Sequence, residues 1–176
     1  MSDFYEEIVR QRGSLERLVG RMPGFRGYQD KRARRKADTM LRDHVTGLIK
    51  QCIDKMVRIE KAILDNSGME HLTRTRDVKA RIQLLHDKVR AAAPGYSGMW
   101  AQMKIEPEEL EKIYSFDEAL IPLVDKIDVA LDSLEQAALD KKGVDKAIAQ
   151  VDTVATEALE AFRSRDDVLT KFSKEL

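Results

Sequence analysis

Several residue types that build other classes of protein are scarce in this chain. It has one cysteine, four prolines and 6% aromatic residues, whereas 35% of its 176 residues are charged. A single cysteine excludes an intrachain disulfide. Sandwiches and barrels need more aromatic residues, threonine and glycine. The composition is typical of a helical protein of about one domain.

Long apolar runs are also absent. No stretch approaches the roughly 20 apolar residues that cross a bilayer. The first residues, `MSDFYEEIV`, are acidic and lack the apolar core of a secretory signal. These features predict a cytoplasmic protein. Cys52 lies in `LIKQCIDKM`, at helical spacing from Leu48 and Met56. We expect a buried, small apolar residue rather than a reactive thiol.

Apolar residues recur every three or four positions, which predicts helices. The expected helices cover about residues 3–19, 28–65 and 69–93, the stretch from Pro107 to the `DKKG` turn at 140–143, and residues 144–172. The predicted fold class is all-α: an elongated antiparallel up-down bundle of four long helices plus a short N-terminal helix. We expect one domain over 1–176, with 1–20 as the amphipathic helix. An open or domain-swapped dimer with the same helix pairings is the main competing architecture.

The apolar stripes identify the expected core. In the second helix one stripe runs from Ala33 to Ile63, and a second stripe widens it: Met40, Ile49, Ile53, Val57 and Leu64. Asp117 and Arg165 interrupt the stripes of the last two helices, and Pro122 is expected to kink the fourth helix.

Charge is distributed unevenly along the chain. Residues 1–100 hold 21 Lys and Arg against 13 Asp and Glu, a net charge of +8, and residues 101–176 hold 10 against 18, a net charge of −8. Such a chain can pair its halves internally, pair between subunits, or offer a basic face to an acidic partner.

The stretch `PGFRGYQDKRARRKAD` concentrates positive charge at the start of a helix, where anions are normally favoured. Alternating helix directions place this stretch at the same end of the bundle as `PGYSG` at 94–98. We therefore predict a basic and aromatic partner-binding surface, built from 20–39 and 94–118. Its residues are Phe25, Arg26, Tyr28, Lys31, Arg32, Arg34, Arg35, Tyr96 and Trp100.

Two interpretations of these cations remain open. The glutamates at 106–111, together with Asp166 and Asp167, are positioned to neutralise them internally. Alternatively, the cations recruit an anionic partner. A structural network of Asp38, Tyr114 and Asp117 is expected at this end, and we favour pairing of Asp117 with an arginine over a catalytic carboxylate.

Two blocks, `PGFRGYQDKRARRKADTMLRDH` and `YSGMWAQMKIEPEELEKIYSFDEAL`, resemble sequences of a family of small uncharacterised bacterial helical proteins. The resemblance covers about half of the chain. It implies a bacterial cytoplasmic protein, and it transfers no catalytic role to any residue.

Enzyme signatures are mostly missing. The chain has no Gly-rich phosphate loop and no Gly-x-Ser-x-Gly motif. Leu41, Gly68 and Gln83 occupy the positions three residues before the histidines, so no Glu-x-x-His pair exists. We therefore expect no catalytic residue, no cofactor and no metal site.

The leading hypothesis is a non-enzymatic interaction or assembly module that binds a protein, either heterologous or a second copy. The second hypothesis is a peripheral protein at the inner membrane face, which binds anionic lipid through the N-terminal helix and residues 21–36. Two further hypotheses are a nucleic-acid-binding protein and an enzyme of unknown type.

Overall fold

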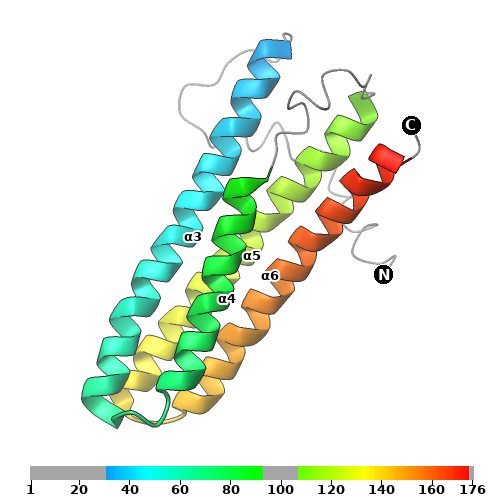
Figure 1. Ribbon diagram of the computed structural model, residues 1–176. Coiled ribbons are helices and arrows are strands. Elements are labelled where there is room, and N and C mark those ends of the chain that lie inside the picture. The colour runs from blue at the N-terminus through cyan, green and yellow to red at the C-terminus, as the bar shows by residue number, and fades with distance from the viewer. Residues whose placement is uncertain (1–30, 93–106, 175–176) are drawn as a thin grey trace.

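The computed structural model describes residues 31–92 and 107–174, and the side chains within 41–92 and 119–164. The described residues form four α-helices and no strand, which confirms the all-α class for this part of the chain. The helices are α3 (Lys31–Ser67), α4 (Leu72–Ala91), α5 (Pro107–Asp140) and α6 (Val144–Lys174) (Figure 1). The helix expected within residues 1–20 lies outside the described residues.

Short loops close two helix pairs at one end of the bundle. α3 ends at Ser67, and the next residue is Gly68, whose φ is 72° and whose amide donates a 3.1 Å hydrogen bond to the carbonyl of Leu64. Gly143, with a φ of 74°, precedes the first residue of α6. Glycine adopts this left-handed conformation without steric cost, so it terminates helices readily. We call this the closed end.

Each loop joins the two helices of an αα-hairpin. In the first hairpin Glu60 of α3 pairs with Lys79 of α4, and Arg42 donates to the carbonyl of Ala92. Because position numbers fall along α3 as they rise along α4, the two helices run in opposite directions. α5 and α6 form the second hairpin in the same way (Figure 1).

The two hairpins lie side by side in parallel orientation. α3 contacts α5, where Lys55 bonds Asp128 and Asn66 bonds the carbonyl of Ala138. α4 contacts α6, where Arg81 pairs with Asp152. Within the described residues, α4 and α5 make no contact and lie on a diagonal of the bundle. The connection through residues 92–106 therefore joins diagonal positions, whereas a bundle with all successive helices adjacent would join neighbours.

One apolar core runs between the four helices. Most residues of the main predicted stripes are buried where side chains are described: in α3 from Leu41 to Ile63, in α4 from Val78 to Val89, in α5 from Leu120 to Ala138, and in α6 from Val144 to Phe162. Leu48 of α3 and Leu72 of α4, which also belong to the predicted stripes, are only partly buried. The second stripe of α3 was predicted wrongly in part. Val57 and Leu64 are 51% and 44% exposed, because they lie at the outer edge of α3 rather than toward the centre. Met40 of that stripe is not among the described side chains.

Candidate functional site

The end opposite the loops is where the predicted partner-binding surface belongs. α3 and α5 run in parallel, so both helices start at this end. α4 ends here at Ala91, whereas α3 has 37 residues against 20 in α4. We call this the open end.

The contact between Arg42 and Ala92 fixes where α4 stops beside α3. The Arg42 guanidinium donates to the carbonyl of Ala92, at the C-terminal cap of α4. The eleven α3 residues before Arg42, from Lys31 to Leu41, therefore extend about 16 Å past that level. The expected helix over 28–65 is about a dozen residues longer than the one over 69–93, which predicts an overhang at residues 28–39. The described helix α3 continues past the end of α4 in the same region.

The predicted surface residues divide into two sets. The backbones of four of them lie in the first turns of α3, within this overhang: Lys31, Arg32, Arg34 and Arg35. The other five lie outside the described residues: Phe25, Arg26, Tyr28, Tyr96 and Trp100. Whether the two sets form one surface therefore stays a prediction.

The predicted network of Asp38, Tyr114 and Asp117 belongs to two neighbouring helices. Asp38 is in α3, and Tyr114 and Asp117 are in α5, each near the start of its helix. α3 and α5 contact each other, so the backbone order is compatible with the network. Their side chains lie outside the described set, and the network also stays a prediction.

Among the described side chains, the richest polar arrangement lies between the hairpins. The Lys55 ammonium on α3 is 2.8 Å from a carboxylate oxygen of Asp128 and also pairs with Asp132, both on α5. The Lys55 side chain is only 12% exposed. Partial burial alone would lower the pKa of Lys55, but hydrogen bonds to Asp128 and Asp132 outweigh it, so the pKa is raised.

At the interface between α4 and α6, basic side chains of the first hairpin again pair with aspartates of the second. Arg74 and His71 approach Asp145, and Arg81 pairs with Asp152 at 2.8 Å while donating to the Thr156 hydroxyl at 2.7 Å. In every ion pair described between the hairpins, the cation or histidine comes from the first hairpin and the carboxylate from the second. The charge asymmetry of the sequence is thus matched internally at these positions.

Cys52 lies in the core beside this arrangement. Its side chain is buried, as predicted. Burial, reinforced by the charge of Asp128, raises the pKa of the thiol from 9.0 to about 12. A thiol that stays protonated at neutral pH is a poor nucleophile, so Cys52 serves packing rather than chemistry.

The three histidines differ in how deeply their side chains are buried. His71 is buried at the N-terminal cap of α4, His86 is partly buried, and His44 is exposed. Within 41–92 and 119–164, no three His, Cys, Asp or Glu side chains are grouped to hold a metal ion.

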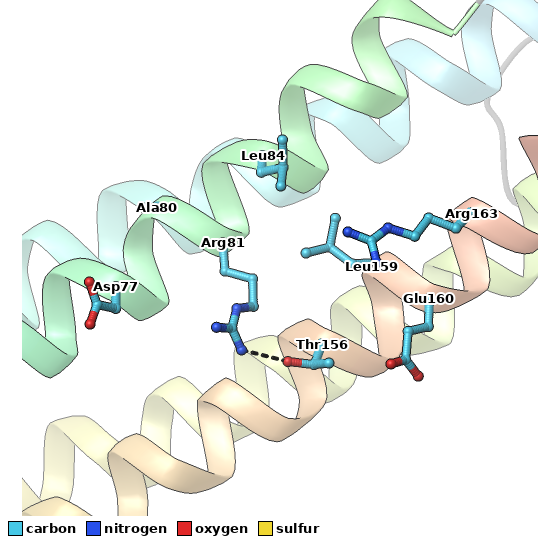
Figure 2. Close-up of a pocket in the computed structure, with 8 residues that line it drawn as sticks. All are labelled: Asp77, Ala80, Arg81, Leu84, Thr156, Leu159, Glu160 and Arg163. Carbon is cyan, nitrogen blue, oxygen red and sulfur yellow. Dashed lines mark hydrogen bonds between the residues drawn. The ribbon is translucent and has the colours of Figure 1, made fainter.

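A shallow groove of about 450 Å³ follows the α4–α6 interface (Figure 2). Arg81 crosses to Thr156 at one part of it, and the apolar side chains Leu84 and Leu159 line the next turn. Glu160 and Arg163 border it from α6. Leu84 is 44% exposed. The groove offers apolar contact between charged edges, but it has no paired nucleophile and base.

Comparisons with known proteins leave the family open. No family model matches the chain, and searches of curated proteins and of solved structures find no significant match. The resemblance to a bacterial helical family therefore stays a prediction. In the described helices, no segment has both the length and the hydropathy of a membrane span.

Proposed function

We propose that this chain is a non-enzymatic interaction module that binds an acidic protein partner through the basic open end. The proposed module is the whole chain, 1–176. In it, residues 1–20 add a short helix to an elongated up-down bundle, and the protein resides in the cytoplasm. Phe25, Tyr28, Tyr96 and Trp100 supply aromatic contacts, and the cations of `KRARRK` supply charge.

The observation that carries this proposal is the unequal length of α3 and α4. The most basic part of α3 lies beyond the end of α4, where that neighbour is missing. α4 does not cover this part of α3, and charged contacts between such a surface and a partner accelerate and orient association.

The pairing of acids elsewhere adds support. Asp128, Asp132, Asp145 and Asp152 already pair with Lys55, Arg74 and Arg81 below the level of Ala92. These four carboxylates of the second hairpin are thus engaged by other cations. Neutralisation of the basic stretch would have to come from acids nearer the open end.

A matched pair of double variants tests the proposal. Arg34→Glu with Arg35→Glu changes the charge of the open end. Arg58→Glu with Lys61→Glu makes the same change at exposed positions in the last third of α3, toward the closed end. We expect the wild type and the control to bind a polyglutamate peptide at low salt, and the open-end variant to bind at least tenfold more weakly. All three should melt within a few degrees of one another.

Two outcomes would contradict the proposal. If the open-end variant melts far below the control, the arginines are neutralised inside the protein. If binding falls equally in both variants, the probe senses net charge alone. Vesicles containing anionic lipid, sedimented at low and high salt, test the membrane hypothesis. If the open-end variant no longer binds the vesicles but still binds polyglutamate as the wild type does, the partner is a lipid surface and not an acidic protein.

A further inference from the structure

The two hairpins are distinct units of opposite charge. Residues 31–92 contain 16 Lys and Arg against 8 Asp and Glu, a net charge of +8, and residues 107–174 contain 9 against 16, a net charge of −7. Each unit is closed by its own short loop at the closed end. The charges that meet across the interface follow the same division, since Lys55, Arg74 and Arg81 all face aspartates of the second hairpin.

The apolar contacts follow the same division of the chain. α3 packs on α5, and α4 packs on α6, so each hairpin presents two helices to the other. The apolar face of the first hairpin includes Ile49, Met56 and Ile82, and that of the second includes Ile127, Leu134 and Ile148. All six side chains are at most 1% exposed, so each hairpin needs the other to cover its apolar face.

A single connection joins the hairpins. It contains the fifteen residues 92–106 and links the end of α4 to the start of α5 across the bundle diagonal. Neighbouring helix axes are about 8–10 Å apart, which makes the diagonal roughly 13 Å. Fifteen residues span up to about 50 Å when extended. The connection is therefore long enough to join hairpins that belong to two different bundles.

We propose that the hairpin interface also forms between two copies of this chain. The α5–α6 hairpin of one copy packs on the α3–α4 hairpin of the other, and the resulting dimer repeats every contact of the closed monomer. This partner is recognised by charge and apolar complementarity at the hairpin interface. The proposal does not rest on the basic stretch of α3, although the connection that passes between the two copies contains Tyr96 and Trp100 of the open-end surface.

The connection sets the concentration at which exchange occurs. A short connection of this length holds two modules at an effective concentration on the order of 1 mM. Because monomer and exchanged dimer contain the same contacts, the monomer dominates at micromolar concentration and the dimer becomes comparable near millimolar concentration. Blocking closure within one chain should shift this balance strongly toward the dimer.

Reversing the charges at the hairpin interface should prevent the two hairpins of one chain from packing on each other. An acidic variant carries Lys55→Glu, Arg74→Glu and Arg81→Glu, which makes both hairpins acidic at the interface. A basic variant carries Asp128→Lys, Asp132→Lys, Asp145→Lys and Asp152→Lys, which makes both basic. Neither variant can close on itself with matched charges. A mixture of the two can match every reversed position, but only by exchanging hairpins.

We expect each variant alone to have a melting temperature well below that of the wild type. An equimolar mixture at 10–50 μM, in the micromolar range where intramolecular closure normally dominates, should form a 1:1 heterodimer and regain most of the lost melting temperature. Native mass spectrometry and light scattering measure the mass. As a control, the acidic variant mixed with wild type should give no heterodimer. In that heterodimer the acidic α3–α4 hairpin of the variant would meet the acidic α5–α6 hairpin of the wild type.

Several results would overturn the proposal. The mixture could remain two monomers, or it could regain none of the lost melting temperature although every charge is matched. The acidic variant could also pair equally well with wild type. A second measurement uses the unchanged chain: sedimentation equilibrium of the wild type should show the dimer fraction rising toward one half near 1 mM. A wild type that remains monomeric well above that concentration contradicts hairpin exchange.

Discussion

The two hairpins bury their apolar faces against each other but differ in the relative lengths of their helices. α5 and α6 have 34 and 31 residues, so the second hairpin has nearly equal arms. α3 and α4 have 37 and 20, so the first hairpin has one arm that continues alone. Their charges also differ in sign. The comparison separates two roles: equal arms complete a core, whereas the unequal arm leaves a helix surface uncovered by α4.

The largest expected effect tests whether both hairpins contribute equally to one core. Ile59→Ala in α3 and Leu134→Ala in α5 should each lower the free energy of unfolding by about 2–5 kcal/mol, because both side chains are 0% exposed and leave a cavity. Urea unfolding measures the change. Val57→Ala, two residues from Ile59 but 51% exposed, should cost under about 1 kcal/mol.

A different outcome would separate the hairpins energetically. If Ile59→Ala is costly and Leu134→Ala is nearly neutral, the second hairpin does not share a single cooperative core with the first. Two unfolding transitions in either variant would lead to the same conclusion.

The next effect concerns pH at the hairpin interface. Because the pKa of Cys52 is about 12 in the folded protein and 9.0 otherwise, the folded state holds the thiol proton more tightly. Stability from this group is therefore complete below pH 9 and is lost as pH rises, at about 1.4 kcal/mol per unit. We expect wild type to lose roughly 2 kcal/mol more than Cys52→Ala between pH 8 and 10.5.

Urea unfolding of both proteins at the two pH values measures this difference. Lys55, whose pKa is also raised, is present in both proteins, so the stability it loses at high pH cancels in the comparison. Equal slopes in wild type and Cys52→Ala would show that the thiol titrates in the folded protein as it does in the unfolded chain.

The smallest effect compares an ion pair between hairpins with one inside a helix. Lys55→Met breaks the contacts to Asp128 and Asp132, whose side chains are 54% and 63% exposed and hydrate easily, so we expect a loss of up to about 1 kcal/mol. Lys50→Met breaks the exposed pair with Asp54 and should cost under about 0.5 kcal/mol. Repeating both at 1 M NaCl should shrink the difference. A larger loss for Lys50→Met would contradict the comparison.

Periodicity predicted the inward face of each helix, because apolar spacing records which side avoids water. It could not predict the neighbour on each flank, since the same stripe fits several ring orders. That is why the diagonal placement of α4 and α5 was not anticipated. Val57 and Leu64 were assigned to the core for a related reason: apolar residues at the edge of a stripe look like core in one dimension.

The sequence pattern did not identify the polar residues that are buried in the core. Thr75 is fully buried, and its hydroxyl donates to the carbonyl of Leu72, which satisfies it locally without a charged partner. His71 is buried beside Asp145, a residue about seventy positions away in the sequence. The overhang of α3, by contrast, followed from helix lengths alone. The candidate surface was predictable as a place, whereas its side-chain arrangement depends on residues outside the described part.

The overhang of α3 gives its first turn a local positive potential that does not reside in any side chain, because the opposing C-terminal end of the neighbouring helix α4 lies about 16 Å below it. Both α3 and α5 begin at the open end, and the peptide dipoles of each produce roughly half a positive charge at its first turn. α5 opens with glutamates that offset its share, whereas the first turn of α3 contains no acidic residue. This backbone contribution does not titrate and survives every substitution that preserves the helix. A chain stripped of Lys31, Arg32, Arg34, Arg35 and Lys36 should therefore still attract anions weakly at the first turn of α3.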